Sequence, residues 1–408
     1  MINHYLDDLL NSSQRVLLLQ GPVGEFFFEF GKWLKLNQKM VYKINFNGGD
    51  EFFYPNSIEN TFSYKEHFVL LKAYLYDFCK HHQIDAIVCF GDNRPCHKIA
   101  KKIANLLNIN FWVFEEGYFR PHYVTLEKDG VNAYSPFPKN ANFFLNLKTM
   151  LKEPEKPQAL AKGFIPMANR AIRYYWEAYK NHKHYSNYSH HRILDPKYYV
   201  KRWMISAIKR ICYWSRERFF AYKVERCRFG DFFIVPLQVY NDSQVKEHSD
   251  YKSVEAFLRT VLSSFVLKAP AHFKLIVKHH PMDRGFIDYL AVINEFIELY
   301  PQLKGRVFYV YDVPLPVFLR KGMGMVTLNS TSGLSALLHG MPVKTLGRAN
   351  YDFAGLTHQG DLDGFWLAPQ APNEEVFTVY RTFHLNKTQI NGSFYNKVLL
   401  KDKENDGI

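Results

Sequence analysis

Hydrophobic residues in the first 150 positions form two kinds of run. Amphipathic stretches with helical spacing occupy residues 63–83 and 97–109. Short apolar runs of strand length lie around them and end in turns: 15–20, 40–46, 85–90 and 110–116. Strands that alternate with helices in this way predict βαβ units around a parallel sheet.

The same alternation returns after residue 231. Helical spacing covers residues 254–269 and 286–300. The strand-like runs are 231–239, 273–281, 306–312, 324–328 and 342–347. Each half therefore has the pattern of a nucleotide-binding fold, and the chain is predicted to be an α/β protein with two Rossmann-like domains facing a cleft. This is the GT-B arrangement of glycosyltransferases, in which ligands bind at the carboxyl ends of strands.

The middle of the chain has a different pattern, in which aromatic and basic residues interleave at helical spacing. We interpret it as long helices between two domains. The predicted organisation is an N-terminal Rossmann-like acceptor-side domain, a basic aromatic helical segment, a C-terminal Rossmann-like domain that binds the nucleotide sugar, and a tail that is expected to be helical. The boundaries are 1–150, 151–228, 229–365 and 366–408.

The net charge of +13 is concentrated in this middle segment. Between Met167 and Arg228 the chain has 15 Lys and Arg against 4 Asp and Glu, so the rest is close to neutral. Local basic character predicts a docking surface. Its Tyr and Trp residues suit an anionic bilayer better than nucleic acid, although they could instead pack between the domains. The cations expected at the membrane are Lys201, Arg202, Lys209 and Arg210.

Targeting segments and metal motifs are not evident. We expect no signal peptide, because the first residues lack a basic flank followed by an apolar run. Since no run approaches the roughly 20 apolar residues of a membrane span, a soluble or peripheral protein is predicted. The five cysteines match no zinc pattern, so we expect buried reduced thiols and no metal.

Candidate chemistry in the second half lies where strands end. The turn at 329–333 offers Asn329, three hydroxyls and Gly333 at a helix start, which suits either a phosphate or a simple helix cap. The segment Lys278-His279-His280-Pro281 places a histidine where it can donate to a phosphate or protonate a leaving group. Asp242 is a candidate nucleophile or base, with a helix cap as the alternative. The three hydroxyls belong to Ser330, Thr331 and Ser332.

Strand ends in the first half offer carboxylates and glycine-rich turns. Glu115 and Glu116 are adjacent on a predicted strand, so at most one faces the cleft, and which one stays open. Arg120 is suited to a substrate carboxylate or to one of these glutamates. The turns are expected to wrap an acceptor sugar or lipid head group, through Gln20, Gly21, Asn47, Gly48, Asp50, Asp92 and Arg94.

Ten strings in this order resemble the capsule polysaccharide β-Kdo transferases of the KpsS type. They cover nearly the whole chain and are far more specific together than singly, although the basic middle segment is poorly matched. The strings are LLLQGPVGEFF, KINFNGGDEFFY, FGDNRPCHKIA, FEEGYFRPHYVTLE, GVNAYS, VPLQVYNDSQV, VKHHPMDRG, NSTSGLSALLHG, VKTLGRANYDFAGLTHQG and NGSFY.

The resemblance implies a GT-B enzyme that uses CMP-Kdo as donor, without a further cofactor or metal. Its implied acceptor is lyso-phosphatidylglycerol, an anionic phospholipid, at the cytoplasmic face of the bacterial inner membrane. The implied product carries the first β-Kdo of a linker, which a bifunctional transferase extends before the capsule export complex acts. Because donor and product are both β-linked, configuration is retained, which requires a carboxylate nucleophile and an acid/base.

Motif by motif, the resemblance implies roles for particular residues. His280-Pro281 is similar to the HP motif whose histidine contacts the CMP phosphate, and the Ser/Thr turn at 330–332 to the motif that holds the same phosphate. Asp242 corresponds to the nucleophile and Glu116 to the acid/base, with Glu115 as the second choice. The alternatives are a transferase for another CMP-sugar, such as sialic acid, and a non-catalytic component of the export complex.

Overall fold

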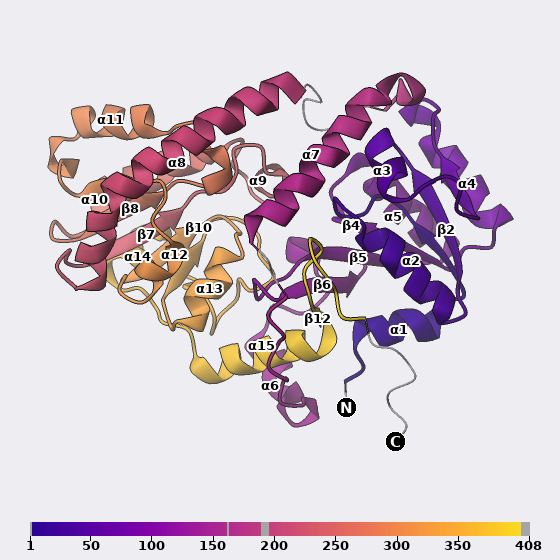
Figure 1. Ribbon diagram of the computed structural model, residues 1–408. Helices are drawn as coiled ribbons and strands as arrows, with labels where there is room; N and C mark the ends of the chain where they lie inside the picture. Colours follow the sequence, from indigo (N-terminus) through magenta and orange to yellow (C-terminus); the bar gives the residue numbers. More distant parts are fainter. Residues whose placement is uncertain (1, 161–162, 189–195, 401–408) are drawn as a thin grey trace. The chain divides into compact units, whose positions relative to one another are not determined.

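The computed structural model describes residues 2–160, 163–188 and 196–400, which fold into two compact units (Figure 1). Unit 1 consists of Met1–Pro136, Thr149–Pro196 and Thr382–Ile408, and unit 2 of Phe137–Lys148 and Lys197–Arg381. Each unit contains one sheet and the helices that pack on it. The predicted α/β class, with a parallel-rich sheet in each half, is confirmed.

The sheet of unit 1 has seven strands in the order β12-β6-β5-β4-β1-β2-β3. Strands β1 to β5 pair in parallel, whereas β6 and β12 are antiparallel to their neighbours. The strands are β1 (Arg15–Leu18), β2 (Met40–Asn45), β3 (Thr61–Ser63), β4 (Ala86–Phe90), β5 (Asn110–Glu116), β6 (Tyr123–Lys128) and β12 (Gln389–Asn391).

The central strands of unit 1 are apolar on both faces. Val16, Leu17 and Leu18 of β1 are fully buried, and so are Ile87 and Val88 of β4, with which they pair. Near-continuous apolar runs are typical of parallel strands covered by helices on both sides. The helices of unit 1 are α1 (Tyr5–Ser12), α2 (Phe26–Leu36), α3 (Gly48–Phe53), α4 (Leu71–His81), α5 (Pro95–Leu107) and α7 (Phe164–Lys180), with 3-10 turns η1 (Phe68–Leu70), η2 (Asn132–Tyr134) and η4 (His182–Tyr185).

One edge of this sheet is made by segments that the hydrophobic pattern does not predict. Strand β6 pairs with β5, and β12 adds a further strand from the chain's C-terminal region. Ile390 pairs with Val124, and the Gln389 side chain donates to the Thr125 hydroxyl at 2.9 Å. A three-residue strand is too short to show a period of two, so the sequence alone does not reveal it.

The sheet of unit 2 has five strands in the order β11-β10-β7-β8-β9, all parallel. Its strands are β7 (Phe232–Pro236), β8 (Lys274–Lys278), β9 (Val307–Val310), β10 (Gly324–Thr327) and β11 (Val343–Thr345). Its helices are α6 (Ala141–Leu147), α8 (Pro196–Glu225), α9 (Ser243–Glu247), α10 (Val254–Lys268), α11 (Leu290–Leu299), α12 (Leu315–Leu319), α13 (Ser332–Leu338) and α14 (Leu362–Leu367), with turns η5 (Pro281–Asp283) and η6 (Pro301–Leu303).

Three elements have residues assigned to both units. They are turn η3 (Lys148–Met150), helix α8, whose first residue Pro196 belongs to unit 1, and helix α15 (Glu374–Lys387). Helix α15 is followed directly by β12, so the region predicted as a tail includes a helix and a strand of the unit 1 sheet.

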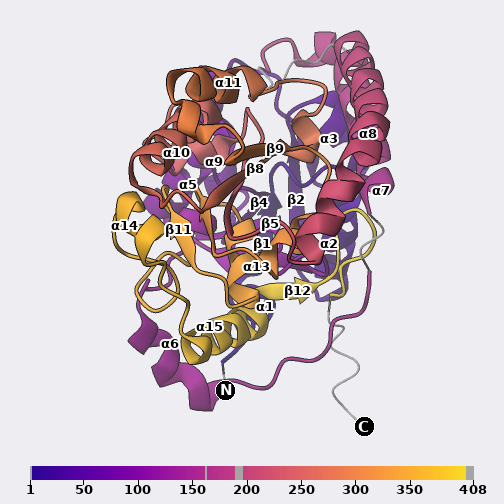
Figure 2. The same ribbon diagram turned by 90° about the vertical axis from the view of Figure 1, so that its left-hand side faces the viewer.

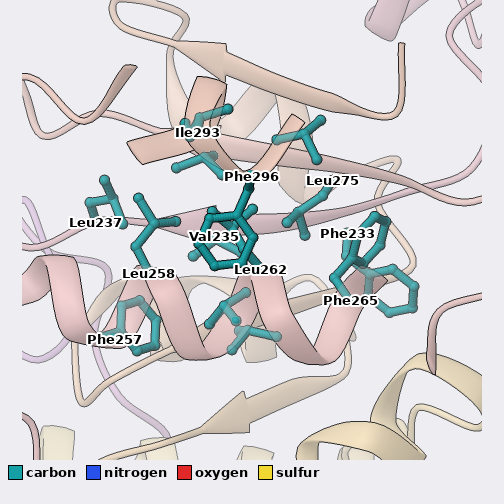
Figure 3. Close-up of a cluster of buried hydrophobic side chains, with 14 of the residues drawn as sticks. Phe233, Val235, Leu237, Phe257, Leu258, Leu262, Phe265, Leu275, Ile293 and Phe296 are labelled. Carbon is teal, nitrogen blue, oxygen red and sulfur yellow. The ribbon is translucent and has the colours of Figure 1, made fainter. Parts of the chain in front are cut away.

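Helix α10 forms much of the core of unit 2. Leu258, Leu262 and Phe265 on its inner face pack among Phe233 and Val235 of β7, and all five are fully buried (Figure 3). Their positions on the helix repeat at intervals of three and four residues, which gives one continuous apolar stripe. This stripe fixes the position of β7, the strand that precedes Asp242.

The middle segment forms two separate helices in the described residues, α7 in unit 1 and α8 in unit 2. Helix α8 runs uninterrupted for 30 residues along unit 2 (Figure 2). Tyr213 stacks on Tyr311 with ring centroids 3.9 Å apart, and the Glu217 carboxylate accepts from the amides of Tyr311 and Asp312 at 2.8 and 2.7 Å. In the part of the chain that the structure describes, no helix is both long and apolar enough to span a bilayer.

All five cysteines are free thiols. Cys79, Cys89 and Cys96 are buried, and burial raises their pKa. Cys212 and Cys227 are exposed, so the expectation of buried thiols is wrong for these two. They lie on α8 and in the loop after it.

The α10 stripe makes a prediction for stability. Replacing Leu258 by Ala should lower the free energy of unfolding by about 2–5 kcal/mol, because it leaves a cavity in a close-packed core. Leu267, on the same helix but 68% exposed, is the matched control, and its change to Ala should cost no more than about 0.5 kcal/mol. Denaturant unfolding monitored by circular dichroism measures both, and equal effects would show that α10 is not the core element described.

Candidate functional site

The sheet of unit 2 brings its predicted site residues to one edge. Strands β10, β7 and β8 are neighbours and run parallel, so their carboxyl ends lie side by side. Asp242 follows β7, His280 follows β8, and Ser330 follows β10. The first strand in sequence, β7, lies between β10 and β8, which makes this edge the topological switch point where open sheets bind ligands.

Asp242 is fixed as the N-terminal cap of α9. One carboxylate oxygen, Oδ1, accepts from the Gln244 amide at 2.9 Å, and the other, Oδ2, accepts from the Gln238 side chain at 3.3 Å. The cap that the sequence left as an alternative is thus present, and the carboxylate is only half-buried. A nucleophilic role for Asp242 stays a prediction.

The end of β8 places its three polar residues in different surroundings. Burial lowers the pKa of Lys278 to about 8, against the opposing effect of Glu217 and Asp312. Burial also lowers the pKa of His279 to about 4, and its Nδ1 lies 2.6 Å from the Tyr309 hydroxyl. His280 is partly exposed, so it is the histidine of the pair that reaches solvent.

His280 begins the turn η5, in which Pro281 is the first residue. The Met282 amide donates to Nδ1 of His280 at 3.2 Å, which orients the imidazole ring. An Nδ1 that accepts this bond leaves the Nε2 nitrogen as the one that carries the proton in the neutral ring. Its contact with a donor phosphate stays a prediction.

The turn after β10 is held by side chains around it. Asn329 Nδ2 donates to the carbonyls of Gln244 and His248 at 3.0 and 3.2 Å, which ties the end of β10 to α9. The Ser330 hydroxyl donates to Ser332 Oγ at 3.1 Å. Helix α13 starts directly after Thr331, which makes no side-chain cap bond. These contacts fix the backbone of the turn that was predicted to bind phosphate.

Close packing against Tyr351 explains why residue 333 is a glycine. A Cβ atom at this position would lie 2.4 Å from the hydroxyl oxygen of Tyr351. That hydroxyl donates to the Ser330 carbonyl at 2.5 Å, so the ring crosses the start of α13. The glycine is therefore required by Tyr351, and ligand approach is not needed to explain it.

In unit 1 the two adjacent glutamates at the end of β5 have different partners. The Tyr395 hydroxyl donates to Glu116 Oε1 at 3.0 Å, whereas Glu115 Oε1 accepts from the Glu116 amide at 2.9 Å. Burial raises the pKa of Glu115 to about 7, with the charges of Glu116 and Asp92 adding to the effect and Arg120 opposing it. Glu115 is thus poised between its two protonation states near neutral pH.

Tyr395 was not singled out from the sequence as a site residue. It lies just after β12, and the neighbouring Phe394 packs against Phe26 and Phe90 with centroid distances of 4.8 and 5.4 Å. The string NGSFY pointed to this segment without suggesting a contact with Glu116. Only the pairing of β12 with β6 brings the two together.

Two more buried carboxyl groups lie in unit 1. Asp92 Oδ2 accepts from the Val131 amide at 3.1 Å, and burial raises the pKa of Asp92. Burial raises the pKa of Glu127 to about 8, although the Ser135 and Tyr118 side chains oppose this. Sequence reasoning missed Glu127 because it did not predict β6.

Several residues predicted for the acceptor form a hydrogen-bonded network. Gln20 Nε2 donates to Asp50 Oδ2, and the Tyr174 hydroxyl donates to Asp50 Oδ1, each at 2.9 Å. Asn47 Nδ2 donates to the Tyr174 hydroxyl at 2.8 Å. Tyr174, one of the aromatics of the basic segment, is therefore buried in unit 1, and the network contributes to the packing of α7 on α3.

Gly48 lies under α7, where a Cβ atom would come within 2.6 Å of the Glu177 carbonyl oxygen. This close approach explains the glycine by helix packing. Arg94 Nη1 donates to the Gly21 carbonyl at 3.5 Å, which links the ends of β4 and β1. Arg120 is exposed. Whether any of these residues contacts an acceptor stays a prediction.

In the described ranges, neither a surface depression on α7 nor a group of possible metal ligands adds residues to the predicted site. A shallow depression of about 290 Å³ on α7 is lined by Asn169, Ile172, Arg173 and Trp176, none of which was predicted as a site residue. Over residues 2–160, 163–188 and 196–400, no three His, Cys, Asp or Glu side chains are grouped so as to hold a metal ion.

A mostly parallel sheet in unit 1 and a parallel sheet in unit 2, each with polar side chains at its strand ends, define an α/β protein of the open-sheet class. The chain belongs to the family of capsule polysaccharide biosynthesis proteins, whose sequence profile matches residues 85–395.

Full-length relatives agree with this family. The chain is 52% identical to the capsule polysaccharide modification protein LipB of Neisseria meningitidis serogroup B, over 99% of this chain and 97% of that protein. It is 37% identical to the capsule polysaccharide export protein KpsS of Escherichia coli, over 95% of this chain and 98% of that protein. The resemblance to KpsS-type capsule proteins is confirmed.

Among solved structures, the chain is similar to the β-Kdo 2,7-transferase and the β-Kdo 2,4-transferase of Thermosulfurimonas dismutans KpsC. The identities are 12% and 13%, and the TM-scores are 0.41 and 0.42. The matches cover 91% and 90% of this chain, and 99% and 90% of those chains. Similarity of this degree says nothing about the activity of this chain.

The pKa of Glu127 predicts a pH dependence of stability. Folded unit 1 keeps the proton on Glu127 up to a pKa of about 8, whereas the unfolded chain releases it near 4.5. The stability that the neutral acid contributes is complete below the lower value and is lost as pH rises through the higher one. Glu127→Gln should therefore reduce the fall in thermal midpoint between about pH 5.5 and about pH 8.5.

Glu59, which is exposed in the same unit, provides the control. Its change to Gln should leave the fall in midpoint as it is in the unaltered protein. If Glu127→Gln and Glu59→Gln behave alike, Glu127 does not titrate in the range stated.

Proposed function

We propose that this protein is a retaining β-Kdo transferase that moves the first Kdo from CMP-Kdo to lyso-phosphatidylglycerol, at the cytoplasmic face of the inner membrane. The observation that carries the proposal is the meeting of Asp242, His280 and Ser330 at one edge of the unit 2 sheet. The GT-B arrangement of the two units is part of the proposal. So are its partners, the bifunctional poly-Kdo-extending transferase and the export complex.

In this proposal unit 2 binds the donor. The His280 ring and the hydroxyls of the Ser330 turn hold the phosphate of CMP, because charge-assisted bonds and helix-start amides favour an anion. Lys278, with a pKa of about 8, is mostly protonated at neutral pH and adds positive charge behind them. Together these groups stabilise CMP as it leaves with its negative charge.

The carboxylates carry the two displacement steps. A carboxylate oxygen of Asp242 forms a bond to the anomeric carbon of Kdo as the bond to the CMP phosphate breaks. The acceptor hydroxyl then attacks that carbon, gives its proton to a glutamate, and releases Asp242. The resemblance assigns the proton transfer to Glu116. The pKa of about 7 favours Glu115 instead, because a general acid/base is most effective when its pKa lies near the working pH.

Asp242→Asn tests the nucleophile without disturbing the fold. The amide oxygen of Asn keeps the cap bond to the Gln244 amide, so α9 should remain in place. Transfer from CMP-Kdo to lyso-phosphatidylglycerol, followed by mass spectrometry, should fall by about a thousandfold or more. CMP affinity should stay within a few-fold of the unaltered protein, because the carboxylate acts on the sugar.

Asp250→Asn is the matched control, since the Asp250 side chain is 93% exposed a few residues further on, and its transfer rate should not change. Near-normal turnover by folded Asp242→Asn would remove Asp242 from the catalytic groups. If the protein transfers sialic acid from CMP-sialic acid in preference to Kdo, the proposed donor is wrong, whereas the proposed site residues are unaffected.

His280→Ala and Ser330→Ala test the phosphate position. Each removes a proposed bond to the CMP phosphate, which is worth about 1.5–3 kcal/mol, or about 10- to 150-fold in affinity. Calorimetry with CMP measures this, and the exposed His272, just before β8, provides the control as His272→Ala. Unchanged CMP affinity in both site variants would show that the phosphate binds elsewhere.

A further inference from the structure

Helix α8 presents a row of large apolar side chains to solvent. Val200, Met204, Ile208, Ile211 and Trp214 are each between 52% and 71% exposed. Their spacing of three and four residues places them on one face of the helix. At about 1.5 Å per residue this row, the α8 stripe, is about 21 Å long. Contiguous exposed apolar surface of this kind marks an interaction site.

The other side of α8 is occupied by unit 2. Besides the stacking of Tyr213 and the bonds of Glu217, Arg202 Nη1 donates to the Gly285 carbonyl at 3.1 Å. A Cβ atom on Gly285 would lie 2.2 Å from the Arg202 carbonyl oxygen, so the helix is seated closely. These contacts fix which face of α8 points outward. They also engage Arg202, one of the cations that the sequence predicted for the membrane, within unit 2.

The charges around the α8 stripe are almost all positive. The helix contains eight Lys and Arg and two Glu. Of the two acids, Glu217 is turned inward to the backbone amides of unit 2. Lys201, Arg210 and Arg218 are exposed and lie beside the stripe. Apolar and cationic side chains along a single helix are the combination that lies flat in an anionic lipid interface.

We propose that the α8 stripe docks the protein on an anionic bilayer, with α8 lying in the plane of the interface. Charge complementarity favours an anionic bilayer as the partner of the stripe. A second copy of the protein, docked through the same face, would instead bring like charges together. The stripe residues enter the head-group layer while Lys201, Arg210 and Arg218 meet the lipid phosphates. This deepens the membrane association within the proposed function, but it involves none of the residues assigned to transfer.

The test is flotation of the full-length protein with vesicles of phosphatidylcholine, with and without phosphatidylglycerol. A triple change of Met204, Ile208 and Ile211 to Ser should reduce the bound fraction on anionic vesicles by about tenfold or more, because three buried apolar side chains are lost. The matched control changes Leu36, Leu106 and Leu299 to Ser, which are 64–80% exposed on other helices, and should bind normally. Thermal unfolding checks that both variants fold.

The charge component has its own variant. Lys201→Glu, Arg210→Glu and Arg218→Glu together should abolish binding to anionic vesicles, since each cation near such a surface contributes about fivefold. Binding should also weaken as salt is raised. Vesicles of phosphatidylcholine alone should bind the unaltered protein much less well.

Two results would overturn the proposal. One is flotation that is unchanged by the stripe variant. The other is a dimer of the unaltered protein in lipid-free sedimentation that the stripe variant dissociates, which would assign the stripe to a second copy. Failure of the proposed transferase is distinguishable, because it would appear as no product from a soluble short-chain acceptor while flotation stays intact.

Discussion

Burial of both sheets on both faces is the constraint on which the rest of the structure depends. The central strands of each unit are apolar throughout, so polar side chains have little room among them. Polar and charged residues gather instead where the strands end, and parallel pairing brings those ends to one edge. The positions of Asp242, His280 and Ser330 follow from this arrangement, as does that of Glu115.

Desolvation shifts the pKa of buried groups in both units towards their neutral forms. In unit 1 burial raises the pKa of Asp92, Glu115 and Glu127, so protons are retained where the unfolded chain would release them. In unit 2 burial lowers the pKa of Lys278 to about 8 and that of His279 to about 4, so at neutral pH Lys278 is mostly charged and His279 is neutral. The proposed function uses two of these shifts, for proton transfer at Glu115 and for anion binding beside Lys278.

The parallel strands and the polar loops that follow them were predictable, because apolar runs bounded by turns carry a strong local signal. Strand β12 and its partner β6 were not, since their pairing joins segments more than 250 residues apart. The partners of Glu116 and the burial of Glu127 depend on that pairing and were missed with it. The outward face of α8 was also hidden, because apolar residues on a helix usually point inward. The contacts of Arg202, Tyr213 and Glu217 with unit 2 show which side is covered.

The order of the chain bears on how the protein is made. The segments of the two units alternate along the chain, and the sheet of unit 1 acquires β12 only from residues 389–391, after the last residue of unit 2. A ribosome therefore has to finish unit 2 before the edge strand and Tyr395 exist to complete the neighbourhood of Glu116. A nascent chain that has not reached this point holds an unpaired sheet edge at β6, which favours aggregation or capture by chaperones. The late arrival of one short strand thus delays completion of the unit 1 sheet until the residues of unit 2 have been synthesised.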